Sequence, residues 1–167
     1  MVQHEGRTAC RSWRGGYVRA MATVTRDLRC APAAVLEVLA DGWAYATWVV
    51  GASRIRAVDP TWPAPGARIA HSVGVWPALL DDTTVARAWD PERGIDLQAR
   101  AWPAGEGRVQ ITVLPLPEGG CRVEMREDAV RGPGTLVPRP LRTAALVPRN
   151  VETLRRLGYL AERRTTV

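Results

Sequence analysis

The stretch Arg26-Asp-Leu-Arg-Cys-Ala-Pro-Ala-Ala-Val-Leu-Glu-Val-Leu-Ala-Asp41 contains the end of a strand, a break and a helix. Apolar and polar side chains alternate from Thr23 to Cys30, with Arg26 as the exception, as they do in a half-buried antiparallel strand. Pro32 suits the first turn of a helix, and apolar residues then recur at helical spacing until Gly42 ends the run. The stretch therefore predicts a strand followed by a short helix of about two turns.

The segment after this helix, Trp43-Ala-Tyr-Ala-Thr-Trp48, is short and aromatic, which predicts a second helical turn packed on the core. Strand patterns separated by turns rich in Gly, Pro and Asp then recur along the chain. The predicted strands lie near 52–58, 67–76, 82–89, 94–102, 107–114 and 120–129. Residues 131–140 are rich in Pro and Gly, so we expect irregular structure there.

A helical pattern runs from Leu141 to about Glu162, with apolar or small residues at helical spacings. Pro148 inside it predicts either a kink or a helix that begins at that residue. The order strand, two short helices, further strands and one long C-terminal helix excludes alternating βαβ units. It favours an α+β fold in which an antiparallel sheet of about seven strands packs on helices.

This order resembles the START-like superfamily, also called SRPBCC. The likeness is carried by residues 26–41, by the turn that ends at Trp48, and by Arg149-Asn-Val-Glu-Thr-Leu-Arg-Arg-Leu157, and it spans about residues 22–163. The resemblance implies a helix-grip fold, in which a curved sheet grips the C-terminal helix and leaves a cavity. Polyketide cyclases, plant pollen allergens, carriers, hormone receptors and chaperone activators share the fold. The superfamily has no short catalytic signature, so the resemblance implies no catalytic residue.

The chain of 167 residues is long enough for one sizeable core. We expect a single START-like domain over residues 21–167, preceded by a disordered N-terminal extension over residues 1–20, which lack helical or strand periodicity. Apolar runs stay well short of the roughly 20 residues that span a bilayer, and the first twenty residues lack a signal-peptide pattern. We therefore expect a cytoplasmic protein without stable membrane insertion.

The net charge of +6 is concentrated at the ends of the chain. All 23 basic residues are Arg, while Lys and Phe are absent and Asn occurs once, a composition typical of a high-GC bacterial genome. Residues 21–138 carry 12 Arg against 14 acidic residues, which is unlike a groove that tracks phosphates. We expect no nucleic-acid partner.

The cysteines and histidines are too few and too scattered to form a metal site. Cys10, Cys30 and Cys121 contain no C-x-x-C pair, and the histidines are His4 and His71 alone. We expect reduced cysteines, no metal and no cofactor.

Three polar residues share the strand face of apolar neighbours. His71 is in phase with Ile69 and Val73, Arg87 with Val85 and Trp89, and Glu127 with Val123 and Met125. Alternate side chains of a strand share a face, so an imidazole, a guanidinium and a carboxylate are candidates to enter one cavity. The alternatives are a structural role for His71, an Arg87 that extends to solvent, and a Glu127 at a strand end where the alternation has failed.

The predicted pocket combines these residues with apolar and aromatic neighbours. Its members are Trp48, His71, Val73, Arg87, Trp89, Leu97, Met125, Glu127, Asn150 and Leu154. Trp48 and Trp89 are the preferred walls, although in a chain without Phe several Trp side chains must fill core volume. Asn150 either faces the cavity or caps a helical turn after Pro148.

Three functions remain open at this point. The first is binding or carriage of a small hydrophobic ligand, lipid-like or polyketide-like. The second is an enzyme of the cyclase, aromatase or dehydratase type, in which His71 or Glu127 moves a proton. The third is a protein-interaction or stress-response module with a filled core. The identity of the ligand and the oligomeric state are not determined by the sequence.

Overall fold

The computed structural model describes residues 22–75, 77–101 and 105–164. The predicted disorder of residues 1–20 therefore lies outside the described residues. Within the described part, the order of elements is the predicted one: a strand, short helices, further strands and a long helix.

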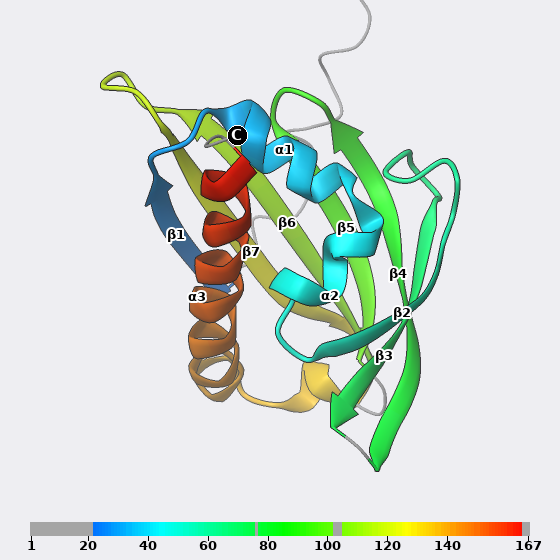
Figure 1. Cartoon of the computed structure of the whole chain (residues 1–167). Helices are drawn as coiled ribbons and strands as arrows, with labels where there is room; N and C mark the ends of the chain where they lie inside the picture. The colour runs from blue at the N-terminus through cyan, green and yellow to red at the C-terminus, as the bar shows by residue number, and fades with distance from the viewer. Residues whose placement is uncertain (1–21, 76, 102–104, 165–167) are drawn as a thin grey trace, which may run out of the picture.

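One antiparallel sheet contains all the strands of the described part of the chain (Figure 1). The strands are β1 (Ala22–Leu28), β2 (Ala52–Val58), β3 (Arg68–Val75), β4 (Ala78–Asp90), β5 (Gly94–Ala101), β6 (Gly105–Pro115) and β7 (Cys121–Arg131). Their order in the sheet is β1-β7-β6-β5-β4-β3-β2, so the first strand pairs with the last and β2 forms the opposite edge. The predicted antiparallel sheet is confirmed.

The helices are α1 (Pro32–Ala40), the 3-10 turn η1 (Gly42–Ala44), α2 (Tyr45–Trp48), the 3-10 turn η2 (Pro133–Leu136) and α3 (Arg139–Arg164). The two short helices after β1 are confirmed. Helix α3 continues through Pro148, so the alternative in which the helix begins at that residue is wrong. The irregular segment predicted after β7 contains η2.

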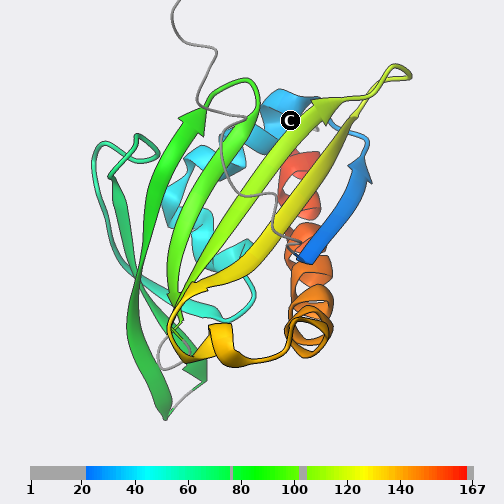
Figure 2. The same cartoon turned by 180° about the vertical axis from the view of Figure 1, so that it is seen from behind.

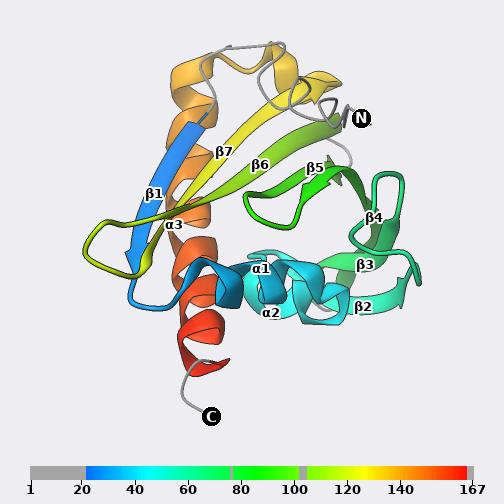
Figure 3. The same cartoon turned by 90° about the horizontal axis from the view of Figure 1, so that it is seen from above.

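Helices α1, α2 and α3 lie on the concave side of the sheet, as the views from behind and from above show (Figures 2 and 3). The core lies between these helices and the sheet. Its largest fully buried side chains include Leu39 of α1, Ile69, Ile95 and Ile111 of the strands, and Leu157 of α3. An α+β helix-grip fold is therefore present, as predicted.

The two halves of α3 differ in how they pack. All its buried residues lie between Asn150 and Ala161, and none lies between Arg139 and Arg149. A Cβ added at Gly158 would approach a methyl carbon of Leu28 to 2.6 Å, so the missing side chain lets the second half of α3 lie close to β1. The second half is thus anchored in the core, while the first half is not.

Candidate ligand-binding cavity

A cavity of about 130 Å³ lies between the concave face of the sheet, α2 and α3. Helix α2 contributes Tyr45 and Trp48, the strands contribute His71, Val73, Leu97, Val109, Met125 and Glu127, and α3 contributes Arg149 and Thr153. The walls are mostly apolar, and the polar groups come from elements far apart in the sequence.

Six of the ten predicted pocket residues line this cavity: Trp48, His71, Val73, Leu97, Met125 and Glu127. Asn150 and Leu154 are buried in α3 without being part of the lining. Trp89 is half-buried and packs against the core outside the cavity. The role of these residues in binding a ligand stays a prediction.

The structure does not place Arg87 in the cavity. Its side chain is exposed and lies on the opposite face of the sheet, where its guanidinium donates a hydrogen bond to Gln98 Oε1. The register of β4 against β5 shifts between Ala86 and Ala88. Such a bulge inserts a residue and reverses the alternation, so Trp89 no longer shares a face with Val85. The prediction that Arg87 faces inward is wrong for this reason.

A hydrogen-bonded chain of three side chains forms the inner wall. His71 Nε2 lies 3.0 Å from Thr84 Oγ1, and the Tyr45 hydroxyl lies 3.0 Å from the same oxygen. The rings of Tyr45 and His71 have centroids 5.3 Å apart. Thr84 and Tyr45 were not among the predicted site residues. The even-numbered run of Asp82, Thr84 and Ala86, all buried, was the available signal for Thr84.

Burial controls the protonation of this wall. It lowers the pKa of His71 below its ordinary value of 6.5, against the opposing effect of the nearby Asp82 carboxylate. It raises the pKa of Asp82, against hydrogen bonding from the Thr83 backbone, and raises the pKa of Tyr45 to about 12. His71 and Tyr45 are therefore neutral near pH 7.

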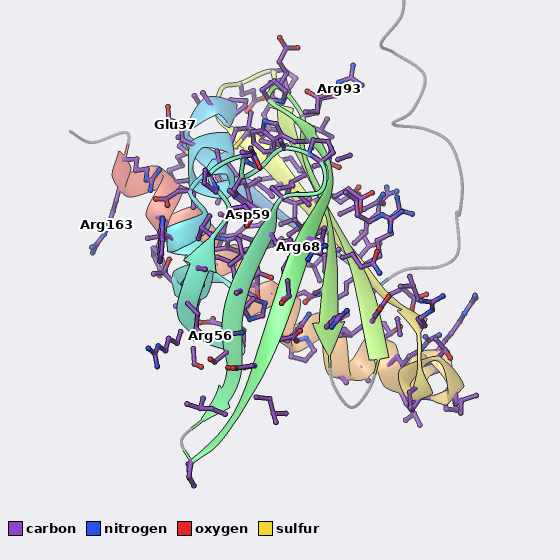
Figure 4. The ribbon with its side chains drawn as sticks, turned by 90° about the vertical axis from the view of Figure 1, so that its right-hand side faces the viewer. Glu37, Arg56, Asp59, Arg68, Arg93 and Arg163 are labelled. Atoms are coloured by element: carbon purple, nitrogen blue, oxygen red, sulfur yellow. The ribbon has the colours of Figure 1, made fainter. Side chains whose placement is uncertain are left out.

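Arg56 lies on the edge strand β2, where Figure 4 labels it. Its guanidinium donates to the carbonyl oxygens of His71 and Asp82, each at 3.3 Å, and pairs with the Asp81 carboxylate at 3.3 Å. One side chain therefore ties β2 to β3 and β4 at the site.

The carboxylate of Glu127 is paired with Arg149 of α3. The side chain of Glu127 is 9% exposed and that of Arg149 is 39% exposed. A buried carboxylate needs such a partner. The guanidinium of Arg149 also donates to Asn150 Oδ1 at 3.4 Å. Asn150 lies well inside α3, so its interpretation as a helix cap is wrong.

Four nitrogen atoms near the cavity are enclosed without a hydrogen-bond partner in the described part of the chain. They are Trp48 Nε1, His71 Nδ1, Arg149 Nε and Asn150 Nδ2. An unpaired buried donor or acceptor costs about 1–3 kcal/mol, so a group of them calls for an explanation.

Other residue types offer less chemistry. Residues 22–75, 77–101 and 105–164 contain no cluster of His, Cys, Asp and Glu that could hold a metal ion. Cys30 and Cys121 are buried free thiols, and burial raises the pKa of Cys121 to about 12. Among the helices in that part of the chain, none is both long and apolar enough to cross a membrane.

The sheet, the long helix and the cavity between them define a helix-grip domain of the START-like type. The family model described as polyketide cyclase / dehydrase and lipid transport matches residues 19–161. The chain belongs to this family. A comparison with curated proteins gives no significant match.

Solved structures share the fold at low sequence identity. The aromatase/cyclase Zhui from Streptomyces sp. R1128 superposes with a TM-score of 0.65 at 19% identity, covering 86% of this chain and 93% of that one. The di-domain ARO/CYC StfQ of the steffimycin biosynthetic pathway gives 0.67 at 13% identity, over 87% of this chain and 51% of that one. Protein NE0264 from Nitrosomonas europaea gives 0.66 at 16% identity, over 87% and 96%. Such likenesses show the fold alone.

Proposed function

We propose that this protein binds a small hydrophobic molecule, lipid-like or polyketide-like, in the cavity between the sheet, α2 and α3. The observation that carries the proposal is the cavity itself: mostly apolar walls with a few polar groups from α2, β3, β7 and α3. A concave apolar site with a few convergent polar groups is the usual form of a small-molecule site. The family description, which includes lipid transport, supports the same class of ligand.

The size of the cavity sets a condition on this function. A volume of about 130 Å³ is below the roughly 300–1,000 Å³ of typical ligand pockets and close to the roughly 150 Å³ of a cavity that accepts benzene. A lipid-sized or polyketide-sized ligand therefore requires the cavity to widen.

The first half of α3 is the wall element best suited to move. It has no buried residue, and two ion pairs join it to β7: Arg142 with Asp128 at 3.2 Å, and Arg149 with Glu127. Pro148 lacks a backbone N–H, which removes the helical hydrogen bond to the carbonyl of Ala144 within this half. We propose that this half moves outward when a ligand enters.

The test combines native mass spectrometry of the purified full chain with thermal unfolding against a panel of fatty acids, sterols and aromatic polyketides. A ligand that binds only the native state raises the melting temperature. A retained compound, or a rise in melting temperature with one ligand class, is the expected result.

A cavity-filling variant gives the matched control. A Cβ at Gly107 would lie 3.7 Å from the Asp128 carbonyl oxygen and 3.9 Å from Glu127 Oε1, both ordinary contact distances, so Gly107→Val adds volume to the cavity lining. Thr112→Val changes the same strand between the buried residues Ile111 and Val113, which point inward, and so leaves the cavity unchanged. Gly107→Val is expected to lose the ligand and Thr112→Val to keep it. No retained compound and an unchanged melting temperature across the panel would favour the interaction module instead.

A second candidate function is catalysis of the cyclase or dehydratase type. The specific observation in its favour is a neutral, enclosed His71 whose Nε2 is engaged by Thr84 and whose Nδ1 has no partner in the described part of the chain. Glu127 is less suited to proton transfer because Arg149 engages its carboxylate. His71→Gln is expected to abolish conversion of a poly-β-ketone thioester while changing its affinity little. Equal conversion by the variant and the wild type would exclude His71 from such a role.

A further inference from the structure

Besides Arg149, whose side chain is 39% exposed, three side chains beside the cavity keep a nitrogen without a hydrogen-bond partner among the described residues, and these three are almost completely enclosed. Trp48 is 2% exposed, His71 is 4% exposed and Asn150 is fully buried. Trp48 belongs to α2, His71 to β3 and Asn150 to α3. Trp48 and His71 line the cavity, whereas Asn150 is buried in α3 outside the lining.

The chemistry of these nitrogens is that of hydrogen-bond donors. The indole nitrogen of Trp48 can only donate. The amide of Asn150 has its orientation set by Arg149, whose guanidinium donates to Oδ1 and leaves the NH₂ group unpaired. A flipped amide would direct its NH₂ group at the guanidinium.

The proton of His71 follows from the hydrogen-bonded chain. If Tyr45 donates to Thr84 and Thr84 donates to Nε2, each hydroxyl proton has an acceptor and the neutral imidazole carries its proton on Nδ1. The reverse direction leaves the proton of the Tyr45 hydroxyl without an acceptor. With this direction of donation, Nδ1 carries the proton and is a third N–H group beside the cavity.

The charges of the lining determine which acceptor these donors suit. The carboxylates of Asp81, Asp82 and Glu127 line the cavity together with the guanidinium groups of Arg100 and Arg149. An anionic ligand would add a negative charge to a lining in which Arg149 already pairs with Glu127, and Arg56 with Asp81. Burial of a charge without a partner is expensive, so a neutral oxygen is the better acceptor.

We infer that the ligand of this cavity carries a neutral oxygen acceptor, as in a ketone, ester or amide, which accepts hydrogen bonds from the N–H groups of Trp48 and His71 in the lining. This inference rests on the proposed ligand-binding function and narrows its ligand class: hydrophobic carboxylates and plain hydrocarbons bind less tightly. The nitrogens are enclosed by the surrounding side chains, so the oxygen reaches them as the cavity widens.

The test uses three molecules of nearly equal shape: acetophenone, α-methylstyrene and benzoate. The first has a neutral carbonyl oxygen, the second a CH₂ group in its place and the third a carboxylate. Their affinities for the full chain are measured by ¹H–¹⁵N NMR titration at pH 7. A neutral hydrogen bond is worth about 0.5–1.5 kcal/mol net, so acetophenone is expected to bind roughly tenfold more tightly than α-methylstyrene. Benzoate is expected to bind more weakly than acetophenone.

The indole N–H resonance of Trp48 provides a readout in the wild-type protein that depends on no variant being folded. It is expected to shift downfield with acetophenone and not with α-methylstyrene. Trp48→Phe is expected to reduce the preference for the ketone. Trp62→Phe is the matched control, because the Trp62 indole already donates to Leu39 O at 3.3 Å, and it should leave the preference unchanged.

The outcomes separate the two levels of the argument. Equal affinity for acetophenone and α-methylstyrene, or tightest binding of benzoate, overturns the inference and leaves the ligand-binding function standing. Absence of binding by all three molecules, together with a flat thermal screen of the larger panel, overturns the proposed function and the inference with it.

Discussion

The Glu127–Arg149 ion pair offers the sharpest test of how the cavity is stabilised. The change is Arg149→Met, which keeps most of the aliphatic length and removes the charge. The Glu127 side chain is 9% exposed and, within the described part of the chain, pairs with Arg149 alone, so the variant leaves a buried carboxylate without its counter-charge. Breaking a buried pair costs about 3–5 kcal/mol, and the 39% exposure of Arg149 reduces this to about 2–3 kcal/mol.

The converse variant should cost less. Glu127→Gln leaves Arg149 partly exposed and still in contact with Asn150 Oδ1, so we expect a loss of about 1 kcal/mol. The double variant Arg149→Met/Glu127→Gln should be more stable than Arg149→Met alone, because the buried charge is gone.

The assay is urea denaturation of all four proteins at pH 7 and at pH 5. A buried carboxylate without a partner favours protonation, so Arg149→Met should regain stability as the pH falls, relative to the wild type. Equal losses for the two single variants, or exact additivity in the double variant, would show that the pair does not carry the cost of burying Glu127.

Three further predictions concern the hydrogen-bonded wall and the packing of α3. Folding lowers the pKa of His71, so the unfolded chain binds a proton at a higher pH than the folded chain does. The contribution of His71 to stability should therefore rise with pH up to about 6.5, the ordinary pKa of histidine, and stay constant above that pH. Folding raises the pKa of Asp82, so the contribution of Asp82 to stability has the opposite sign and falls as the pH rises from 3.8. Denaturation of His71→Gln and of the wild type from pH 4.5 to 8 isolates the part of the pH dependence of stability that is due to His71. The same pH dependence in both proteins would contradict the lowered pKa of His71. Thr84→Val removes the shared hydrogen-bond partner of Tyr45 and His71 and should lower the free energy of unfolding by about 2–4 kcal/mol. A Phe at position 45 leaves the Thr84–His71 hydrogen bond and should lower it by about 1 kcal/mol. Equal losses in the denaturant midpoint would argue against a hydrogen-bonded chain through Thr84. Leu157 is fully buried, so an Ala at position 157 should lower the free energy of unfolding by about 2–5 kcal/mol in the same assay. Leu141 is 62% exposed, so an Ala at position 141 should lower it by less than about 0.5 kcal/mol. Similar losses would mean that both halves of α3 are anchored in the core.

Local periodicity in the sequence was sufficient to predict the elements and their order. A strand repeats its side-chain directions every two residues, and a helix every three to four. These short repeats were enough to predict the strand from Thr23, the helix that starts at Pro32 and the long C-terminal helix. The order of these elements excluded a parallel sheet, and the inward parity of His71 and Glu127 placed both at the cavity, as the structure shows.

The partners within the site depended on the tertiary structure. Arg87 shares the outer face with Val85, and the bulge between Ala86 and Ala88 returns Trp89 to the core side; bulges leave no clear mark in a single sequence. The pairing of Glu127 with Arg149 joins β7 to a helix that reaches it only after the chain has folded back across the sheet.

Periodicity determines which side of an element faces the core. The amino-acid sequence by itself therefore determined an α+β helix-grip domain with apolar and polar side chains on the concave face of its sheet. Contacts between residues distant in the chain depend on register and on how closely helices approach the sheet. Packing alone therefore decided the Tyr45–Thr84–His71 chain, the volume of the cavity and the unpaired donors around it.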